Sequence, residues 1–186
     1  MKANRILWFG LFICLVTTMN ELAAQSRMIQ NKSRPTAEID PVFPYDIPLK
    51  TMAGDTILSS ETLDNEGRPI VLAFWLTTCL PCRIEMKNIT PYYEDWIEET
   101  GVRIVFISTD FEHNAPKIAK FIEDNNYPFE VYHDMHREFR NMLPGGLNGL
   151  PQTFLINDRG DILYHKRKYS SGDEFKLYDA MKASVN

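Results

Sequence analysis

The stretch of this chain that most constrains its fold is the apolar segment Ile70–Leu76, which is followed closely by Cys79 and Cys82. Nearly continuous apolar segments are typical of strands that are covered on both faces. From Leu80 to about Thr100 the apolar residues instead recur at helical spacing, and Pro81 stands in the first turn, where its missing N–H does no harm. The sequence therefore predicts a central strand that ends beside two cysteines and a helix that begins with them.

The rest of the chain alternates between strand and helix patterns. Pro91 should kink the helix after the cysteines, and Gly101 should end it. Beyond it we expect a strand (102–108), a helix (114–126), a short extended piece (128–133), a hairpin (152–157 and 161–166) and a last helix with Asp173 as its N-cap (172–184). Two turn signals between residues 42 and 70 predict an N-terminal β-hairpin. Because strand–helix–strand order requires a parallel crossover and a hairpin requires an antiparallel pair, we predict an α/β fold with a mixed central sheet and helices on both faces.

The N-terminal residues have the pattern of a secretory signal peptide. Lys2 and Arg5 are followed by an uncharged apolar run from Ile6 to Met19, and small residues precede a cleavage site expected after Ala24. The alternative is an uncleaved N-terminal membrane anchor, for which this run is short. We therefore expect a signal peptide (1–24), a polar flexible linker (25–41) and one folded domain (42–186) in an exported protein.

Charge and cysteine content narrow the class of function. The formal net charge of −5 and the lack of a basic stripe argue against a nucleic-acid partner. Cys14 lies inside the predicted signal peptide, so Cys79 and Cys82 are the cysteines of the mature chain. A disulfide between residues three apart closes a very short loop and stabilises a fold little, which favours a redox role over a structural one. At a helix N-terminus the pKa of the Cys79 thiol should be lowered, making Cys79 the nucleophile and Cys82 the resolving cysteine.

The chain resembles the exported TlpA/ResA type of thioredoxin-like thiol–disulfide oxidoreductase from about residue 43 to the last helix. The motifs that carry the resemblance are VLAFWLTTCLPCRIEM (71–86), VRIVFISTD (102–110), KFIEDNNYPFEVYHD (120–134) and GLPQTFLINDRGDIL (149–163). The resemblance implies a thioredoxin-like fold with an N-terminal hairpin extension and a central inserted helix and strand. It also implies exported partner proteins with disulfides, apocytochrome c among the possibilities, and a membrane redox donor. No cofactor is expected because the dithiol itself carries two electrons, and we expect a monomer.

The same resemblance assigns residues to the partner-binding surface. Pro151 corresponds to the family's cis-proline, beside which the backbone of Leu150 can pair with an extended substrate segment. Trp75, Leu80 and Pro81 are expected to complete this surface. Proline directly before the second cysteine resembles the reductants of the family, so we expect a reductase.

Several positions depart from the family pattern. Thr78 replaces the usual tryptophan before the first cysteine, and Leu80 replaces a glutamate that some members carry. Ala73 and Phe106 stand where thioredoxin has a buried aspartate and its lysine partner. The loss of both members together is coherent, because the loss of one would leave a buried charge unpaired.

No carboxylate therefore stands at the usual places to take a proton from Cys82. Glu85, one helical turn further on, is the candidate proton acceptor. The competing interpretation, which the sequence favours, is that Glu85 is an ordinary solvated residue on the helix surface.

Three other functions compete with this hypothesis. Cys79 and Cys82 with His133 and His136 could form a zinc site or a copper site of the Sco type, but Sco-type cysteines have three residues between them, and we expect no metal. A peroxiredoxin-like peroxidase needs a threonine three residues before its reactive cysteine, where this chain has Leu76. A non-catalytic binding module would have no need of the two cysteines.

Overall fold

The computed structural model describes residue 43 and residues 45–186. The predicted signal peptide and linker lie outside these residues. Within them, no helix is both long enough and apolar enough to span a membrane.

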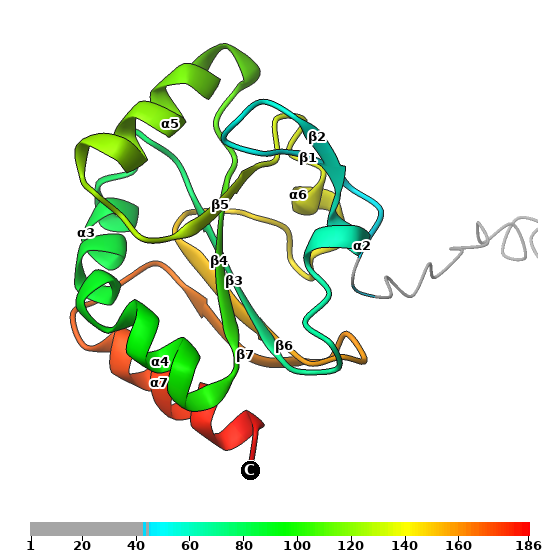
Figure 1. Cartoon of the computed structure of the whole chain (residues 1–186), viewed down its shortest axis with the longest axis vertical. Helices are drawn as coiled ribbons and strands as arrows, with labels where there is room; N and C mark the ends of the chain where they lie inside the picture. Colours follow the sequence, from blue (N-terminus) through cyan, green and yellow to red (C-terminus); the bar gives the residue numbers. More distant parts are fainter. Residues whose placement is uncertain (1–42, 44) are drawn as a thin grey trace, which may run out of the picture. The chain divides into compact units, whose positions relative to one another are not determined.

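A seven-stranded mixed sheet forms the centre of the described domain, with the strand order β2-β1-β5-β4-β3-β6-β7 (Figure 1). The strands are β1 (Pro48–Lys50), β2 (Thr56–Leu58), β3 (Ile70–Trp75), β4 (Arg103–Ser108), β5 (Glu130–His133), β6 (Gln152–Ile156) and β7 (Ile162–Arg167). Strands β3, β4 and β5 are parallel, while β6, β7 and the N-terminal hairpin β1–β2 pair antiparallel to their neighbours. The predicted mixed sheet is therefore confirmed, with β3 as an interior strand between β4 and β6 that is buried along its whole length.

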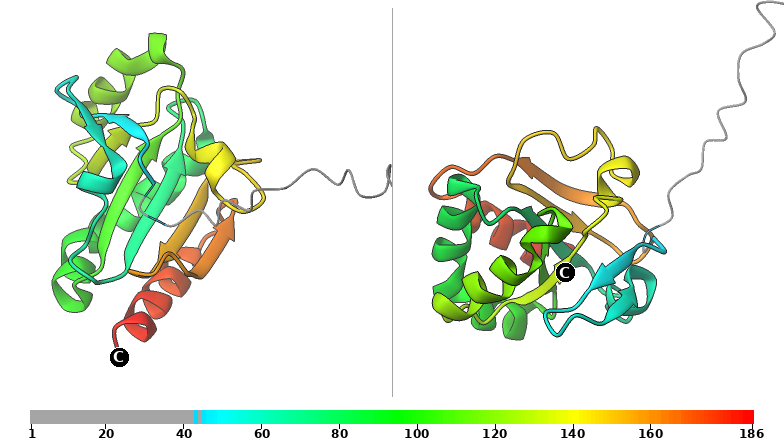
Figure 2. Two further views of the ribbon diagram at one scale, coloured as in Figure 1. Left: turned by 90° about the vertical axis from the view of Figure 1, so that its right-hand side faces the viewer. Right: turned by 90° about the horizontal axis from the view of Figure 1, so that it is seen from above.

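Helices cover both faces of this sheet, but unequally (Figure 2). The helices are α2 (Ser59–Thr62), α3 (Leu80–Ile89), α4 (Tyr93–Thr100), α5 (Ala115–Asp124), α6 (Phe139–Met142) and α7 (Asp173–Ser184). The four longer helices pack on the face that carries Val71, Ala73 and Trp75 of β3. The opposite face carries Ile70 and the alternate residues of β3, and it is covered by α6, the end of α2 and the segment before β1.

The predicted kink after the cysteines is a short 3-10 turn between two α-helices. Helix α3 ends at Ile89, a 3-10 turn spans Thr90–Tyr92, and α4 begins at Tyr93. Pro91 explains this turn because it has no N–H to continue the helical hydrogen bonds. Gly101 ends α4 in a left-handed conformation with φ of 67°, as expected.

Two local expectations need correction. The N-cap of α7 is Gly172, and Asp173 is the first helical residue, whose carboxylate accepts the Ser170 N–H at 2.9 Å. The four-residue helices α2 and α6 were not expected, because one turn is too short to show a periodic pattern. Helix α6 begins where Asp134 accepts the backbone N–H groups of Glu138 and Phe139.

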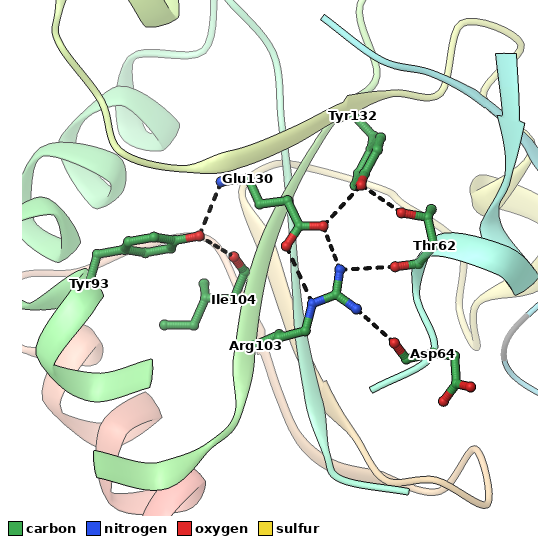
Figure 3. Close-up of polar contacts among 7 residues, drawn as sticks. All are labelled: Thr62, Asp64, Tyr93, Arg103, Ile104, Glu130 and Tyr132. Carbon is green, nitrogen blue, oxygen red and sulfur yellow. Dashed lines mark hydrogen bonds and ion pairs between the residues drawn. The ribbon is translucent and has the colours of Figure 1, made fainter. Parts of the chain in front are cut away.

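A polar network ties the α2 segment to the sheet (Figure 3). Arg103, at the start of β4, forms an ion pair with Glu130, at the start of β5. The Arg103 guanidinium also donates to the carbonyl oxygens of Asp64 at 2.7 Å and Thr62 at 2.9 Å. The Tyr132 hydroxyl donates to the Glu130 carboxylate at 2.9 Å. Arg103 pairs with the first residue of β3, so this network lies at the end of the sheet opposite the cysteines.

Candidate active site

The two cysteines lie where β3 ends and α3 begins, as predicted. They form a disulfide with their Cα atoms 5.3 Å apart. Cys79 is the N-cap of α3, and its sulfur accepts the backbone N–H of Cys82 at 3.3 Å. Cys79 is half-buried, whereas Cys82 is 0% exposed. Cys79, at the positive end of the helix dipole, is therefore the more accessible of the two cysteines.

Hydrogen bonds to Asp110 hold the loop that leads to the disulfide; we call this arrangement the Asp110 brace. Its buried carboxylate accepts the Thr77 backbone N–H and the Thr77 hydroxyl, both at 2.8 Å, and the Ser108 hydroxyl at 2.9 Å. His133 Nε2–H donates to the Asp110 carbonyl oxygen at 2.8 Å. The sequence reasoning missed this brace. The signal was available, because Thr77 and Asp110 each follow the end of one of two adjacent parallel strands.

The loop before β6 lies next to the disulfide, because Gly149 and Leu150 line the same pocket as Cys79. The Leu150–Pro151 peptide bond is cis, as predicted. The backbone N–H and C=O of Leu150 form no hydrogen bond within the described residues, so both can pair with an incoming segment. A pocket of about 310 Å³ lies here, and Leu76, Cys79 and Leu150 are among the residues that line it.

Glu85 is buried beside the active site, which makes the interpretation as a solvated surface residue wrong. Its side chain is 6% exposed and accepts the Thr153 hydroxyl at 2.8 Å. It lies one helical turn after Cys82, so both side chains lie on the same face of α3. Thr153 pairs with Ala73 of β3, the position at which thioredoxin has a buried aspartate. In this chain the buried carboxylate beside that position is supplied by Glu85 of α3.

Burial raises the pKa of Glu85 to about 7. The Thr153 hydrogen bond lowers the pKa of this carboxyl, and the nearby carboxylates of Asp173 and Glu174 raise it. Asp173 itself is ionised: although its burial raises the pKa, hydrogen bonds from Lys176 and Lys166 bring the pKa of Asp173 down to about 2. Glu85 thus changes protonation near neutral pH, which suits a group that exchanges protons with a thiol.

Of the side chains predicted to form the partner surface, two are exposed and one is buried. Leu80 is 64% exposed and Pro81 is exposed, so both can contact a partner. Trp75 is 1% exposed and packs against Phe121 in the core, so the expectation that it contacts a partner is wrong for this structure. The reason is its place on β3, whose two faces are both covered.

The alternative metal site is not assembled. His133 is buried and donates a hydrogen bond to the carbonyl oxygen of Asp110, and His136 is exposed on the surface. Across residues 43 and 45–186, no group of three or more His, Cys, Asp or Glu side chains is arranged to hold a metal ion.

Comparisons with known proteins agree with this geometry. The model of the AhpC/TSA family matches residues 43–165. The chain is 29% identical over 163 residues to the thiol-disulfide oxidoreductase ResA of Oceanobacillus iheyensis, covering 87% of this chain and 80% of the relative. A thioredoxin-like protein of Porphyromonas gingivalis matches with a TM-score of 0.64 and 31% identity, covering 75% of this chain and 90% of the other. StoA of Bacillus subtilis, at a TM-score of 0.57 and 24% identity over 72% of this chain and 95% of its own, supports the fold alone.

Proposed function

This chain belongs to the AhpC/TSA family and is a thioredoxin-like thiol–disulfide oxidoreductase, and from that premise we propose that it is an exported reductase of protein disulfides. The observation that carries the proposal is the buried Glu85 one turn from Cys82, at a disulfide flanked by a cis-proline loop. An acid with a pKa near 7 beside a resolving cysteine favours a working redox pair over a structural bridge.

Reduction of a partner proceeds in two exchange steps. In the dithiol form, the Cys79 thiolate attacks one sulfur of the partner disulfide, the partner's S–S bond breaks, and its other sulfur leaves as a thiolate. Cys82 then attacks the Cys79 sulfur of the mixed disulfide, which forms the Cys79–Cys82 disulfide and releases the second partner thiolate. Two electrons pass from the dithiol to the partner, and the two leaving thiolates take up two protons.

Glu85 acts on the second step in this proposal. Cys82 must lose its proton before it attacks, because the thiolate is the nucleophile. The Glu85 carboxylate receives that proton and becomes neutral, which its buried place tolerates. The Thr153 hydroxyl holds the carboxylate in place. The reverse transfer returns the proton to Cys82 when the disulfide is reduced again.

Partner binding uses the surface around Cys79. The free backbone groups of Leu150 pair with an extended segment of the partner. The exposed side chains of Leu80 and Pro81 contact the partner from the other side of the sulfur. Electrons arrive from a membrane redox donor, and the substrates are exported proteins with disulfides. Apocytochrome c is one substrate that the family resemblance permits, and no feature of this chain selects it.

A redox titration of the mature protein against glutathione tests this function. We expect a reduction potential well below that of glutathione, together with reduction of insulin that is lost in Cys79→Ser. Cys82→Ser should instead accumulate a mixed disulfide, which mass spectrometry detects. A potential well above that of glutathione would make the protein an oxidase, and full insulin reduction by Cys79→Ser would refute the assignment of the nucleophile.

A second candidate function is a peroxidase, which the AhpC/TSA family match favours. The residue three before Cys79 is Leu76, which has no hydroxyl to activate a peroxide. We therefore expect the reduced protein to consume hydrogen peroxide slowly compared with its reduction of insulin. Rapid, saturable peroxide consumption would reverse this ranking.

A further inference from the structure

The pocket beside Cys79 combines apolar walls with two arginines. Leu76, Leu147 and Leu150 supply apolar surface, and Arg137 and Arg140 also line the pocket. None of the lining residues is acidic. This is unusual for an acidic chain with a formal net charge of −5, so the surface next to the reactive sulfur differs in charge from the protein as a whole.

Arg137 is held in place at this pocket. Its Nε–H donates to the carbonyl oxygen of Thr109, another lining residue, at 2.8 Å. Its guanidinium carbon lies 3.7 Å from the centre of the Phe111 ring. Its backbone has a φ of 58°, a conformation that non-glycine residues rarely adopt. The guanidinium is therefore fixed, while its two Nη groups form no hydrogen bond within the described part of the chain.

Arg140 lies at the rim of the same pocket and is exposed. Its Nη2 donates to the side chain of Asn148 at 3.3 Å, and Asn148 precedes Gly149, which lines the pocket. Neither Arg137 nor Arg140 forms an ion pair with a carboxylate of residues 43 and 45–186. Two guanidinium groups without an acidic partner beside a nucleophile form a site for an anionic group, because guanidinium donors match a carboxylate in geometry.

We propose that this pocket binds an acidic side chain adjacent to the target cysteine of the partner, so that the protein selects disulfides in acidic extended segments. The proposal rests on the proposed function, since it names the substrate class of that same site. The backbone of Leu150 pairs with the segment, the Cys79 sulfur meets its cysteine, and the carboxylate of the neighbouring residue binds Arg137 and Arg140. The apolar walls contact the methylene groups of that side chain.

Three disulfide-linked peptide dimers test the proposal. They share one sequence and differ only in the residues on both sides of the cysteine, which are Glu, Gln or Lys. Each is mixed with the reduced mature protein at low salt, and the second-order rate of peptide reduction is measured by rapid quenching and chromatography. We expect the Glu peptide to react about tenfold faster than the Gln peptide, the Lys peptide to be slowest, and the ratio to fall as salt is added.

Arg140→Gln is the central variant because Arg140 is exposed and its replacement should not disturb the fold. It should bring the Glu-to-Gln rate ratio close to one, because the rate for the Glu peptide falls more than the rate for the Gln peptide. Arg137→Gln should act in the same direction. Arg83→Gln is the matched control: Arg83 is an exposed arginine four residues after Cys79 that lies over Phe121 and does not line the pocket. It should keep the wild-type ratio.

Equal rates for the Glu and Gln peptides with the wild-type protein would overturn the proposal and leave the reductase function intact. A loss of selectivity in Arg83→Gln as large as in Arg140→Gln would also overturn it, because the selectivity would then come from general charge near the sulfur. Failure to reduce any of the three peptides would refute the proposed function itself, and with it this inference.

Discussion

Two glutamates that contact the sheet, the buried Glu85 and the partly buried Glu130, have different surroundings. Glu130 is paired with Arg103 and accepts a hydrogen bond from Tyr132, so its charge is compensated where it lies (Figure 3). Glu85 accepts a hydrogen bond from one hydroxyl group and has no cation among its hydrogen-bond partners. It also lies near two further carboxylates, those of Asp173 and Glu174. A compensated carboxylate holds elements together, whereas an uncompensated buried one is costly to ionise and therefore marks a site where protons move.

The largest effect that tests this contrast is on stability. Glu85→Gln should make the disulfide form more stable than wild type by on the order of 3 kcal/mol above pH 7, because the pKa of Glu85 is raised to about 7 in the folded protein. The unfolded chain ionises Glu85 near pH 4.5, so wild type loses stability as the pH rises from there to about 7.

Urea unfolding of both proteins at pH 4 and at pH 8 measures this difference. It should be small at pH 4, where Glu85 is protonated in both states, and largest at pH 8. A difference that does not change with pH would show that the pKa of Glu85 is the same in the folded and the unfolded protein, so that its pKa is not raised by folding.

The next effect is on rate. Glu85→Gln should slow insulin reduction at pH 7 by about 100-fold, because the variant has no group to take the proton of Cys82. The wild-type rate should fall on the acid side of about pH 7, and this limb should be missing in the variant. Trapping the mixed disulfide would show where the loss occurs: it should accumulate in Glu85→Gln, and an unchanged second step would contradict the role of Glu85.

At the other glutamate, Arg103→Gln should destabilise the fold by about 2 kcal/mol, because it leaves Glu130 partly buried without its cation. The rate of insulin reduction should stay at the wild-type value. The double variant Arg103→Gln/Glu130→Gln is the matched control and should recover part of the stability. A change in the pH–rate profile of Arg103→Gln would contradict the assignment of a structural role to the Arg103–Glu130 pair and a proton-transfer role to Glu85.

The smallest effect concerns the one hydrogen bond to Glu85. Thr153→Val should cost about 1 kcal/mol of stability and raise the pKa of Glu85 further, since the Thr153 hydroxyl lowers it. The acid limb of the rate profile should therefore move to higher pH. Thr153→Ser keeps the hydroxyl and should behave as wild type. If the valine variant leaves the limb in place, the hydrogen bond does not tune Glu85.

The local pattern was sufficient to predict the core of this protein. The strand β3, the helix that begins at the cysteines, the kink at Pro91 and the closing hairpin all follow from apolar spacing and from turn residues, which act over short distances. The cis bond at Pro151 was predicted from a family motif. The short helices α2 and α6 were missed because a single turn carries no period.

The chemistry beside the disulfide was decided by tertiary contacts. Glu85 has the sequence context of a surface residue, and it is buried because α3 packs against a sheet whose Thr153 lies 68 positions away in the chain. Trp75 was expected at the surface, but both faces of its strand are covered. By itself, then, the sequence determined the fold and the reactive pair, since both depend on neighbouring residues. The proton acceptor, the Asp110 brace and the arginine-lined pocket come from the packing of distant segments, which local spacing does not encode.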